Sequence, residues 1–316
     1  MHSTIILGTY NGEKYLPEFL TSLENQTNQD FDILVSDDLS KDNTLNILKS
    51  SIFFRTSRMK IISNNSNHGA AGNFINAINY SPESEYYFFA DQDDYWHKDK
   101  ISILSLLLSN KDNNIPQLVF SDLEVVDKEL NNISKSYFSY TKFNPSNKNL
   151  SFPRLLIENR VPGCAMGFNK KLFMLMRGNI NPQKIVMHDY IALQIAAFFG
   201  EIHHLNQSLI KYRQHETNTI GAPQYSLSYF VKRIKRFYLK YGVHIYKHRH
   251  NQMILKENQA SVLIKLPNAS TRREYEVVKQ FASLELENKL RRILFLIKEK
   301  VYYDKTIETI QGFLTI

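Results

Sequence analysis

The stretch YYFFADQDDYW, from Tyr86 to Trp96, is an apolar run that ends in three acids, Asp91, Asp93 and Asp94. Such a pattern indicates a buried strand that ends at a polar turn. Carboxylates packed this closely repel one another unless a cation lies among them. Aspartate oxygens favour Mg²⁺ or Mn²⁺, and such sites keep open positions for nucleotide phosphates. The alternative is a solvated acidic turn that caps the following helix.

Strands and helices alternate on the N-terminal side of this stretch. Apolar runs predict strands over Thr4–Gly8, Ile33–Ser36 and Lys60–Ser63, of which the first is expected to be central. Apolar residues at helical spacing predict helices over Glu13–Asn25 and Asn73–Tyr80. Alternating strands and helices indicate an α/β fold with a mostly parallel sheet.

Polar clusters follow the predicted strands where each strand ends. In a parallel sheet these ends meet at one edge, and ligands bind in the crevice outside them. The sequence therefore predicts one site built from four distant clusters, at Thr9–Glu13, Asp37–Asp38, His68–Asn73 and Asp91–Asp94.

The second half of the sequence continues the same pattern less regularly. Leu118–Asp122 is a predicted strand, and Asn131–Asn149 reads as a long polar loop. Val161–Phe168 (VPGCAMGF) reads as a strand broken by glycines, where small residues would let a second substrate approach the backbone. The string MHDYIALQIAAFFG predicts a helix with Asp189 in its first turn.

Composition narrows the class of protein. The 316-residue chain is 43% hydrophobic, which excludes a mainly disordered protein and allows one large domain with an appendage. A single cysteine, Cys164, cannot form an intramolecular disulfide and suits a reducing cytoplasm. We expect neither a signal peptide nor a membrane span, since no apolar run is long enough.

Positive charge is concentrated in the tail. From Gln224 onward there are 18 Lys and Arg against 8 Asp and Glu, although the whole chain carries only +8. Apolar residues from Leu227 to Ile245 recur at helical spacing with basic residues between them, which predicts a basic amphipathic helix. Such a helix suits an anionic membrane surface, and packing on the catalytic domain or a second subunit is the alternative. Salt-sensitive binding to anionic liposomes would favour the membrane surface over packing within the protein. No nucleic-acid-binding motif is visible.

These motifs resemble the GT-A glycosyltransferases. The strand-end DQDD, the string TYNGEKYL and the string NHGAAGNF resemble the inverting family 2 enzymes, and ADQDDYW resembles their bacterial rhamnosyltransferase-like branch. The resemblance runs from about Thr4 to Gly221. It implies a GT-A domain over residues 1–221, followed by a basic helical region over residues 222–316.

The resemblance also implies donor-binding residues. The first loop would lie against the nucleoside, and a carboxylate at Asp38 would accept from the ring N–H of uracil or thymine. Leu39 stands where the family often has Gly, which puts the geometry of that turn in question. A plain helix-capping turn is the alternative for each of these motifs. The donor-binding set is Thr9, Asn11, Glu13, Asp38, Gly69, Asn73, Asp91 and Arg213.

The resemblance assigns the remaining roles. Asp189 of the HDY string would be the catalytic base, kept ionised by the helix N-terminus. Arg213 and His215 lie two apart on an expected extended segment, so both would point to one face, Arg213 toward the diphosphate. The metal set is Asp91, Asp93 and His215 with Mg²⁺ or Mn²⁺. The acceptor side is Asp94, Gly163 and His188, and Asp94 could instead support the turn.

The function implied is inverting transfer of a sugar from a nucleoside diphosphate to a hydroxyl. The rhamnosyltransferase resemblance implies L-rhamnose from dTDP-rhamnose and a lipid-linked polysaccharide precursor as acceptor, as for O-antigen or capsule, at the inner face of the cell membrane. A UDP-hexose or HexNAc transferase of the same fold, a non-catalytic nucleotide-sugar-binding protein and a nucleotidyltransferase are the alternatives.

Overall fold

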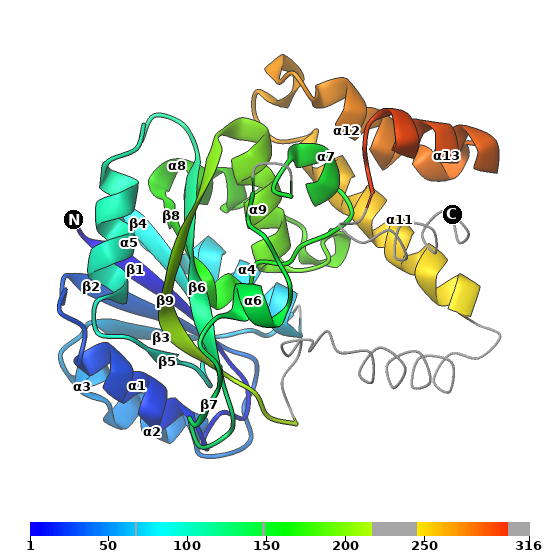
Figure 1. Cartoon of the computed structure of the whole chain (residues 1–316). Helices are drawn as coiled ribbons and strands as arrows, with labels where there is room; N and C mark the ends of the chain where they lie inside the picture. Colours follow the sequence, from blue (N-terminus) through cyan, green and yellow to red (C-terminus); the bar gives the residue numbers. More distant parts are fainter. Residues whose placement is uncertain (67, 147–148, 217–244, 303–316) are drawn as a thin grey trace.

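One mixed sheet forms the centre of the molecule. The computed structural model describes residues 1–66, 68–146, 149–216 and 245–302. Within these residues nine strands form one sheet in the order β3-β2-β1-β4-β8-β6-β9-β5, with β7 paired to β6. Helices cover both faces of the sheet, and the C-terminal helices lie beyond one side of it (Figure 1).

The first four long strands form a parallel half-sheet, as the sequence predicted. They are β1 (Ser3–Thr9), β2 (Phe31–Asp37), β3 (Met59–Ser63) and β4 (Tyr86–Asp91), and β1 pairs with both β2 and β4. Their carboxyl ends are in register, because Gly8 pairs with both Ser36 and Asp91. The polar residues that follow each strand therefore begin at one edge of the sheet.

Short helices connect these strands. Helix α1 (Leu16–Glu24) starts three residues later than predicted and carries Pro17 in its first turn, where the missing N–H costs nothing. Helix α4 (Ala70–Tyr80) starts three residues earlier than predicted. The other helices of this half are α2 (Thr44–Ser50), α3 (Ile52–Arg55) and α5 (Lys100–Ser109).

The second half of the sheet is mixed. Strand β8 (Met166–Asn169) runs antiparallel between β4 and β6 (Gln117–Val126), and β6 runs parallel to β9 (Glu201–Arg213). The short strands β5 (Tyr95–Trp96) and β7 (Asn132–Ser134) pair with β9 and β6. Strand β6 extends four residues past Asp122, so that acid lies within the strand, buried against Ser136 and the N–H of Phe138.

Two predictions for this half were wrong. The segment 131–149 is not a plain loop, because its described part contains β7 and the helix α6 (Tyr137–Tyr140), held by the Asp122 carboxylate. Residues 161–168 do not form one strand, because Gly163–Ala165 is a 3₁₀ turn, η1, and β8 begins only at Met166. The other short elements are α7 (Phe152–Leu155), α8 (Lys170–Met176) and η2 (Pro182–Lys184).

The C-terminal helices pack on the part of the chain that forms the sheet. Helix α9 (His188–Phe199) is buried almost throughout, and α11 (Ile245–Leu263) packs on α9 and on η2. Helix α11 in turn supports α12 (Tyr275–Ala282) and the turn η5 (Leu284–Leu286), while η4 (Ala269–Thr271) joins α11 to α12. The predicted basic helix that begins at residue 227 lies outside the described residues, apart from its end at the start of α11.

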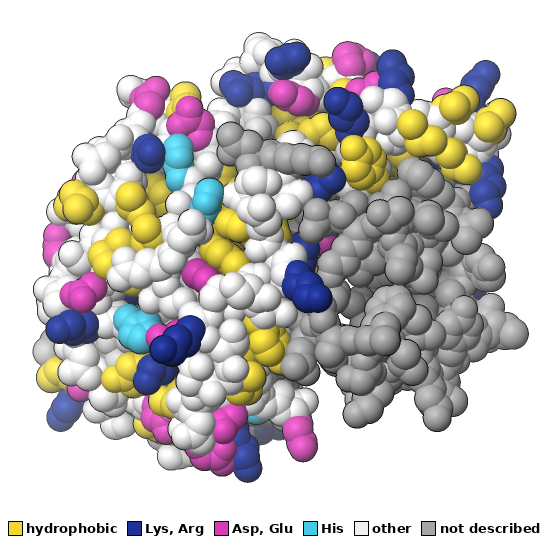
Figure 2. All heavy atoms as spheres, viewed as in Figure 1, with side chains coloured by type: hydrophobic (Ala, Val, Ile, Leu, Met, Phe, Trp, Pro, Cys, Tyr) yellow, Lys and Arg dark blue, Asp and Glu magenta, His cyan; other side chains and the backbone are white. Residues whose placement is uncertain are grey.

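The last described helix, α13 (Lys289–Lys298), has an exposed apolar face. Leu290, Leu294 and Ile297 are more than half exposed, with cations between them such as Arg291. Figure 2 shows apolar and cationic side chains side by side at the α12–α13 end of the molecule. None of the described helices is long and apolar enough to span a membrane.

Gly200 fixes the join between α9 and β9. A Cβ added there would lie 1.7 Å from the carbonyl oxygen of Pro116, which accepts a hydrogen bond from Glu201. We expect Gly200→Ala to lower the free energy of unfolding by about 2 kcal/mol or more in urea denaturation. The control is Gly178→Ala, where the added Cβ meets open space and only the φ of +73° costs about 1 kcal/mol. Equal losses in the two variants would contradict this account.

Candidate active site

A cavity of about 1140 Å³ opens at the carboxyl ends of β1, β2 and β4. It brings together the four polar clusters that the sequence placed at strand ends, so that prediction is confirmed. Glu13, Asp94 and Arg213 do not line it. The lining residues from the predicted set are Thr9, Asn11, Asp38, Gly69, Asn73, Asp91, Asp93, Gly163, His188, Asp189 and His215.

Gln92 locks the loop that follows β1, a role that the sequence analysis did not assign to it. Its carboxamide oxygen accepts from the N–H of Tyr10 at 3.0 Å, and its nitrogen donates to the carbonyl of Tyr10 at 2.9 Å. Gly12 packs against it, and an added Cβ there would lie 2.1 Å from the Gln92 oxygen and displace this side chain. The Thr9 hydroxyl donates to the buried carboxylate of Asp37 at 2.8 Å. These contacts tie the ends of β1, β2 and β4 together.

Asn11 and Glu13 brace the neighbouring loop. The Asn11 side-chain oxygen accepts from the N–H of Lys41 at 2.8 Å, and the Glu13 carboxylate accepts from the N–H of Asn43 at 2.9 Å. Asn11 also lines the cavity and takes a φ of +46°, a conformation that Asn tolerates. The structure thus gives Glu13 a supporting position outside the cavity.

Asp38 lies at the cavity wall, where the resemblance placed the nucleobase. Its carboxylate accepts from Asn64 Nδ2 at 2.9 Å, from His68 Nδ1 at 2.8 Å and from the N–H of Gly69 at 2.7 Å. The sequence reading gave His68 no role, yet it fixes this acid. Leu39 adopts a φ of +63°, so the chain makes the turn that favours Gly with a bulky residue instead.

Asn73 has a different role from the predicted one. Its side-chain nitrogen donates to the carbonyl of Ser36 at 2.8 Å and lies 3.3 Å from that of Thr9. Both amide hydrogens are used to join the ends of β1 and β2, because the earlier start of α4 buries Asn73 within the helix. Its amide therefore does not offer the free donor that ribose or phosphate would need.

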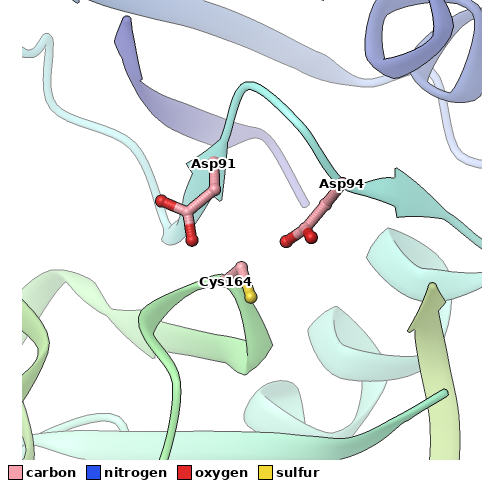
Figure 3. A group of neighbouring side chains, drawn as sticks. All are labelled: Asp91, Asp94 and Cys164. Carbon is pink, nitrogen blue, oxygen red and sulfur yellow. The ribbon is translucent and has the colours of Figure 1, made fainter. Parts of the chain in front are cut away.

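The acids after β4 divide into two groups. Figure 3 shows the side chains of Asp91 and Asp94 converging with that of Cys164 from the η1 turn, and their ligand atoms lie within 4.8 Å of one another. Burial, followed by the charge of Asp93, raises the pKa of Asp91 to about 7 and that of Asp94 well above its usual range. No N–H or O–H of the described residues donates to the buried Asp94 Oδ2. Asp94 is fully buried and does not line the cavity, which fits support of the turn rather than a place on the acceptor side.

The second group is centred on Asp93. His215 Nε2 lies 2.7 Å from the Asp93 carboxylate, and the His215 ring stacks on Tyr15. Arg213 Nε donates to the Asp93 carbonyl at 2.8 Å, so both residues contact Asp93, although only His215 lines the cavity.

The guanidinium of Arg213 supports the turn from outside the cavity. It is almost fully buried, forms an ion pair with Glu18 and donates to the carbonyl of Lys128. Its backbone N–H contacts Asp94 at 3.3 Å. The expectation that Arg213 reaches the donor diphosphate is therefore corrected: this cation holds the acid-bearing turn.

Lys100 is a buried cation that the sequence reading missed. It is the first residue of α5 and is fully buried, and its Nζ donates to the carbonyl of Cys164 at 2.7 Å and lies 3.1 Å from the centre of the Trp96 ring. Burial lowers the pKa of Lys100 to about 7, against the attraction of Asp94 and Asp91. Lys100 thus connects the acids after β4 with the η1 turn.

Asp189 faces the same cavity from the first turn of α9. Burial raises the pKa of Asp189 to about 7, although backbone hydrogen bonds from Tyr190 and Gly163 lower it. Burial therefore opposes the ionisation that the helix N-terminus was expected to favour. Gly163 allows this packing, since an added Cβ would lie 3.1 Å from the Asp189 Cβ and 3.0 Å from His188 Nε2.

His188 is held as a neutral ring. It stacks on Phe74 with 3.6 Å between ring centres and meets the edge of Phe89. Burial lowers its pKa to about 3. Neither ring nitrogen has a hydrogen-bond partner among the described residues, so the ring fits an uncharged contact at the cavity wall.

Comparison with known proteins defines the class. A profile of glycosyl transferase family 2 matches residues 4–174, which is more than half of the chain. The chain belongs to this family of nucleotide-sugar glycosyltransferases, and its architecture is the α/β GT-A fold.

Particular relatives lie at moderate distance. The chain is 31% identical over 231 residues to the dTDP-rhamnosyl transferase RfbG of Shigella flexneri, covering 68% of this chain and 74% of that protein. The solved structure of S. aureus TarS with UDP-GlcNAc has a TM-score of 0.56 at 15% identity and covers 95% of this chain and 79% of that one. Mannosyltransferase PcManGT from Pyrobaculum calidifontis, solved with GDP-Man and Mn²⁺, has a TM-score of 0.50 at 14% identity and covers 98% and 78%.

The raised pKa of Asp189 predicts a pH-dependent cost to stability. A folded-state pKa of about 7, above the ordinary 3.8, means that stability is lost as the pH rises from about 4 through 7. Asp189→Asn removes this cost, so it should raise the thermal unfolding temperature at pH 8. The gain in the free energy of unfolding should be a few kcal/mol at most, and near pH 4 the change should be small. Measurements in EDTA exclude effects of metal bound at the neighbouring acids, and exposed Glu24→Gln is the control. An equal rise of the unfolding temperature at both pH values would show that the burial of an ionised carboxylate is not the cause of the gain.

Proposed function

We propose that the protein is an inverting sugar transferase that uses a nucleoside-diphosphate sugar, with dTDP-L-rhamnose as the favoured donor. The single observation that carries this proposal is the placement of Asp189 and the Asp91 cluster on one cavity. Sugar transfer needs a base for the acceptor hydroxyl beside a site for the leaving diphosphate. The similarity to RfbG supports the choice of donor.

Asp189 suits the role of the base. It faces the cavity, and its pKa of about 7 lies near the operating pH, where a general base combines availability with proton affinity. In the proposed reaction the acceptor O–H gives its proton to the Asp189 carboxylate while the oxygen bonds to the anomeric carbon. The bond from that carbon to the diphosphate breaks on the opposite face, and its electron pair leaves with the nucleoside diphosphate.

The strand-end loops suit the donor. Asp38 is fixed by three donors at the cavity wall, and Gly69 leaves backbone open to close approach beside it. We propose that the nucleobase lies near Asp38, with Thr9 and Asn11 shaping the loop around it. A uracil or thymine ring has an N–H that would donate a hydrogen bond to this carboxylate.

The acids after β4 fit a divalent cation. Asp91 and Asp94 have raised pKa values, and the buried Asp94 Oδ2 accepts from no N–H or O–H of the described residues, which is the environment that a cation relieves. Two sets of possible metal ligands include Asp91. The predicted set adds Asp93 and His215, and the group that the structure brings together adds Asp94 and Cys164. Burial also raises the pKa of the Cys164 thiol, so carboxylates are the better ligands for Mg²⁺ or Mn²⁺. When bound, the metal would neutralise charge on the departing diphosphate.

A UDP-hexose or HexNAc donor is the second candidate. The TarS structure, which holds UDP-GlcNAc, supports it through the shared fold. Small differences in a pocket change the choice of sugar, since a methylene-sized difference is worth only about 1–3 kcal/mol. The acceptor proposed for either donor is a hydroxyl of a lipid-linked glycan.

A donor screen tests this proposal. Purified protein with Mn²⁺ is expected to release nucleotide from dTDP-rhamnose faster than from UDP-glucose or UDP-GlcNAc, and EDTA is expected to stop the release. Asp189→Asn should lower the transfer rate by on the order of 10²–10⁴ while the Kd for the donor stays nearly unchanged, because only the base is removed. Normal turnover with weakened donor binding would show that Asp189 is a binding residue.

A further inference from the structure

The outer face of α13 carries a group of exposed apolar side chains. Leu290, Leu294 and Ile297 are 67%, 56% and 55% exposed, and Leu286, just before the helix, is 87% exposed. Single exposed apolar residues are normal on a protein surface, but a contiguous group marks an interaction site. We call these four side chains the α13 patch.

Helical geometry places the patch on one side of α13. Successive residues of an α-helix are about 100° apart around its axis, so the three patch residues within the helix share an arc of about 60°. The opposite side packs inward, where Leu296 is buried and Phe295 is partly buried against the core. Asn288 caps the helix by accepting from the N–H of Arg291 at 3.0 Å. The patch is therefore the outward face of a helix whose inner face is already packed.

Basic side chains border the patch. Residues 286–300 include five Lys and Arg against two Glu, which gives this segment a net charge of +3. Arg291 and Lys298 each follow a patch residue by one position, and both are more than two-thirds exposed. Each has an acidic partner at 3.2 Å, Glu287 and Glu299 respectively. An exposed ion pair is worth little, so these partners leave the surface attractive to anions.

Helix α11 ties the C-terminal helices to the part of the chain that carries Asp189. The Gln259 side-chain oxygen accepts from the N–H of Val186 at 2.7 Å, three residues before Asp189. The Gln259 nitrogen donates to Gln194 of α9 at 2.8 Å, and both glutamines are fully buried. This contact anchors α11 beside the cavity.

Further hydrogen bonds lead from α11 to α13. The carboxylate of Glu257 in α11 accepts from the N–H of Glu285 in η5 at 2.9 Å. Arg292 Nε of α13 donates to the carbonyl of Glu287, the residue after η5, at 2.7 Å. Helices α12 and α13 lie beyond α9 and α11, on the side away from the sheet (Figure 1). The framework that borders the cavity thus also sets the direction in which the patch faces.

We propose that the α13 patch rests on an anionic lipid surface, with its apolar side chains at the level of the headgroups and the bordering cations against the lipid phosphates. Helices with an apolar face bordered by Lys and Arg lie in a membrane interface in this way. Because the cavity and the patch share one framework, this contact would hold the cavity at a fixed orientation to the membrane. The inference does not depend on the proposed reaction.

A second copy of this chain fits the patch less well. The net charge of +3 on each copy would oppose contact between two such faces. Helix α13 has ten residues, so it is about 15 Å long. A face of this size is too small for the roughly 800 Å² per partner that a stable protein interface buries.

Vesicle flotation of the whole 316-residue chain tests this inference. We expect vesicles of phosphatidylcholine with phosphatidylglycerol to bind the chain about tenfold better than vesicles of phosphatidylcholine alone, and high salt to weaken the binding. Changing Leu290, Leu294 and Ile297 together to Gln should weaken binding to the anionic vesicles by about tenfold, because the apolar contact is lost. Lys298→Glu should also weaken it by about tenfold.

Matched controls separate the patch from general surface effects. Leu106→Gln changes a leucine of α5 that is 56% exposed, as Leu294 is, and Lys265→Glu changes an exposed lysine after α11. Binding of both control variants to the anionic vesicles should stay within about twofold of wild type.

A fluorescent label at one position reports the contact directly. Cys164 is the single cysteine and is buried, so a thiol-reactive NBD dye can be attached selectively to Leu294→Cys. On anionic vesicles its emission should brighten and shift to shorter wavelength, because the dye enters an apolar environment. The same dye on Leu106→Cys should not change.

Three results would overturn the inference. One is equal vesicle binding by wild type and the triple Gln variant, with thermal unfolding showing both folded. Another is an unchanged emission of the dye at position 294 on vesicles that bind the chain, which would place the contact elsewhere. The third is a change of this emission without lipid that accompanies a dimer in analytical ultracentrifugation, which would make a second copy the occupant.

Discussion

Repulsion among the carboxylates at the end of β4 is the constraint on which the rest of the site depends. Asp91 and Asp94 are brought together where burial and mutual charge oppose ionisation. The chain places two buried cations around them, Lys100 beneath and Arg213 behind the turn. These cations hold the turn without entering the cavity, so the cavity face of Asp91 stays available to a ligand.

The same contacts connect the acid cluster with the base. Lys100 donates to the carbonyl of Cys164, and the adjacent Gly163 packs directly against Asp189. The anchor of α11 lies three residues before Asp189, at Val186. Strand β4, the η1 turn, α9 and α11 are thereby fixed to one another around the cavity. A reaction between two bound substrates benefits from such rigidity, because misplacement of reacting groups is costly in rate.

The sequence predicted the half-sheet and the convergence of its loops, because apolar runs and parallel strand ends are local patterns with a fixed geometric consequence. It did not predict which polar groups are already engaged in hydrogen bonds within the protein. Asn73 and Arg213 were assigned to ligands, yet their donors bind carbonyl groups that only the folded sheet brings near. Gln92, Lys100 and Gln259 were missed for the same reason, since their partners lie more than sixty residues away. The sequence correctly predicted that Asp189 lies in the first turn of a helix. The effect of burial on its pKa depends on the surrounding cavity, which the sequence does not reveal.

Thermal unfolding at pH 8 tests whether a cation relieves the repulsion among the carboxylates at the end of β4. The measurement compares wild type and Asp91→Asn in EDTA and with Mn²⁺ plus nucleoside diphosphate. Since burial raises the pKa of Asp91 to about 7, ionisation at pH 8 costs stability, so the variant should unfold at a higher temperature in EDTA. Wild type should gain stability with metal and nucleotide, and the variant should gain little. A variant that is less stable in EDTA, or that gains as much as wild type, would contradict the account.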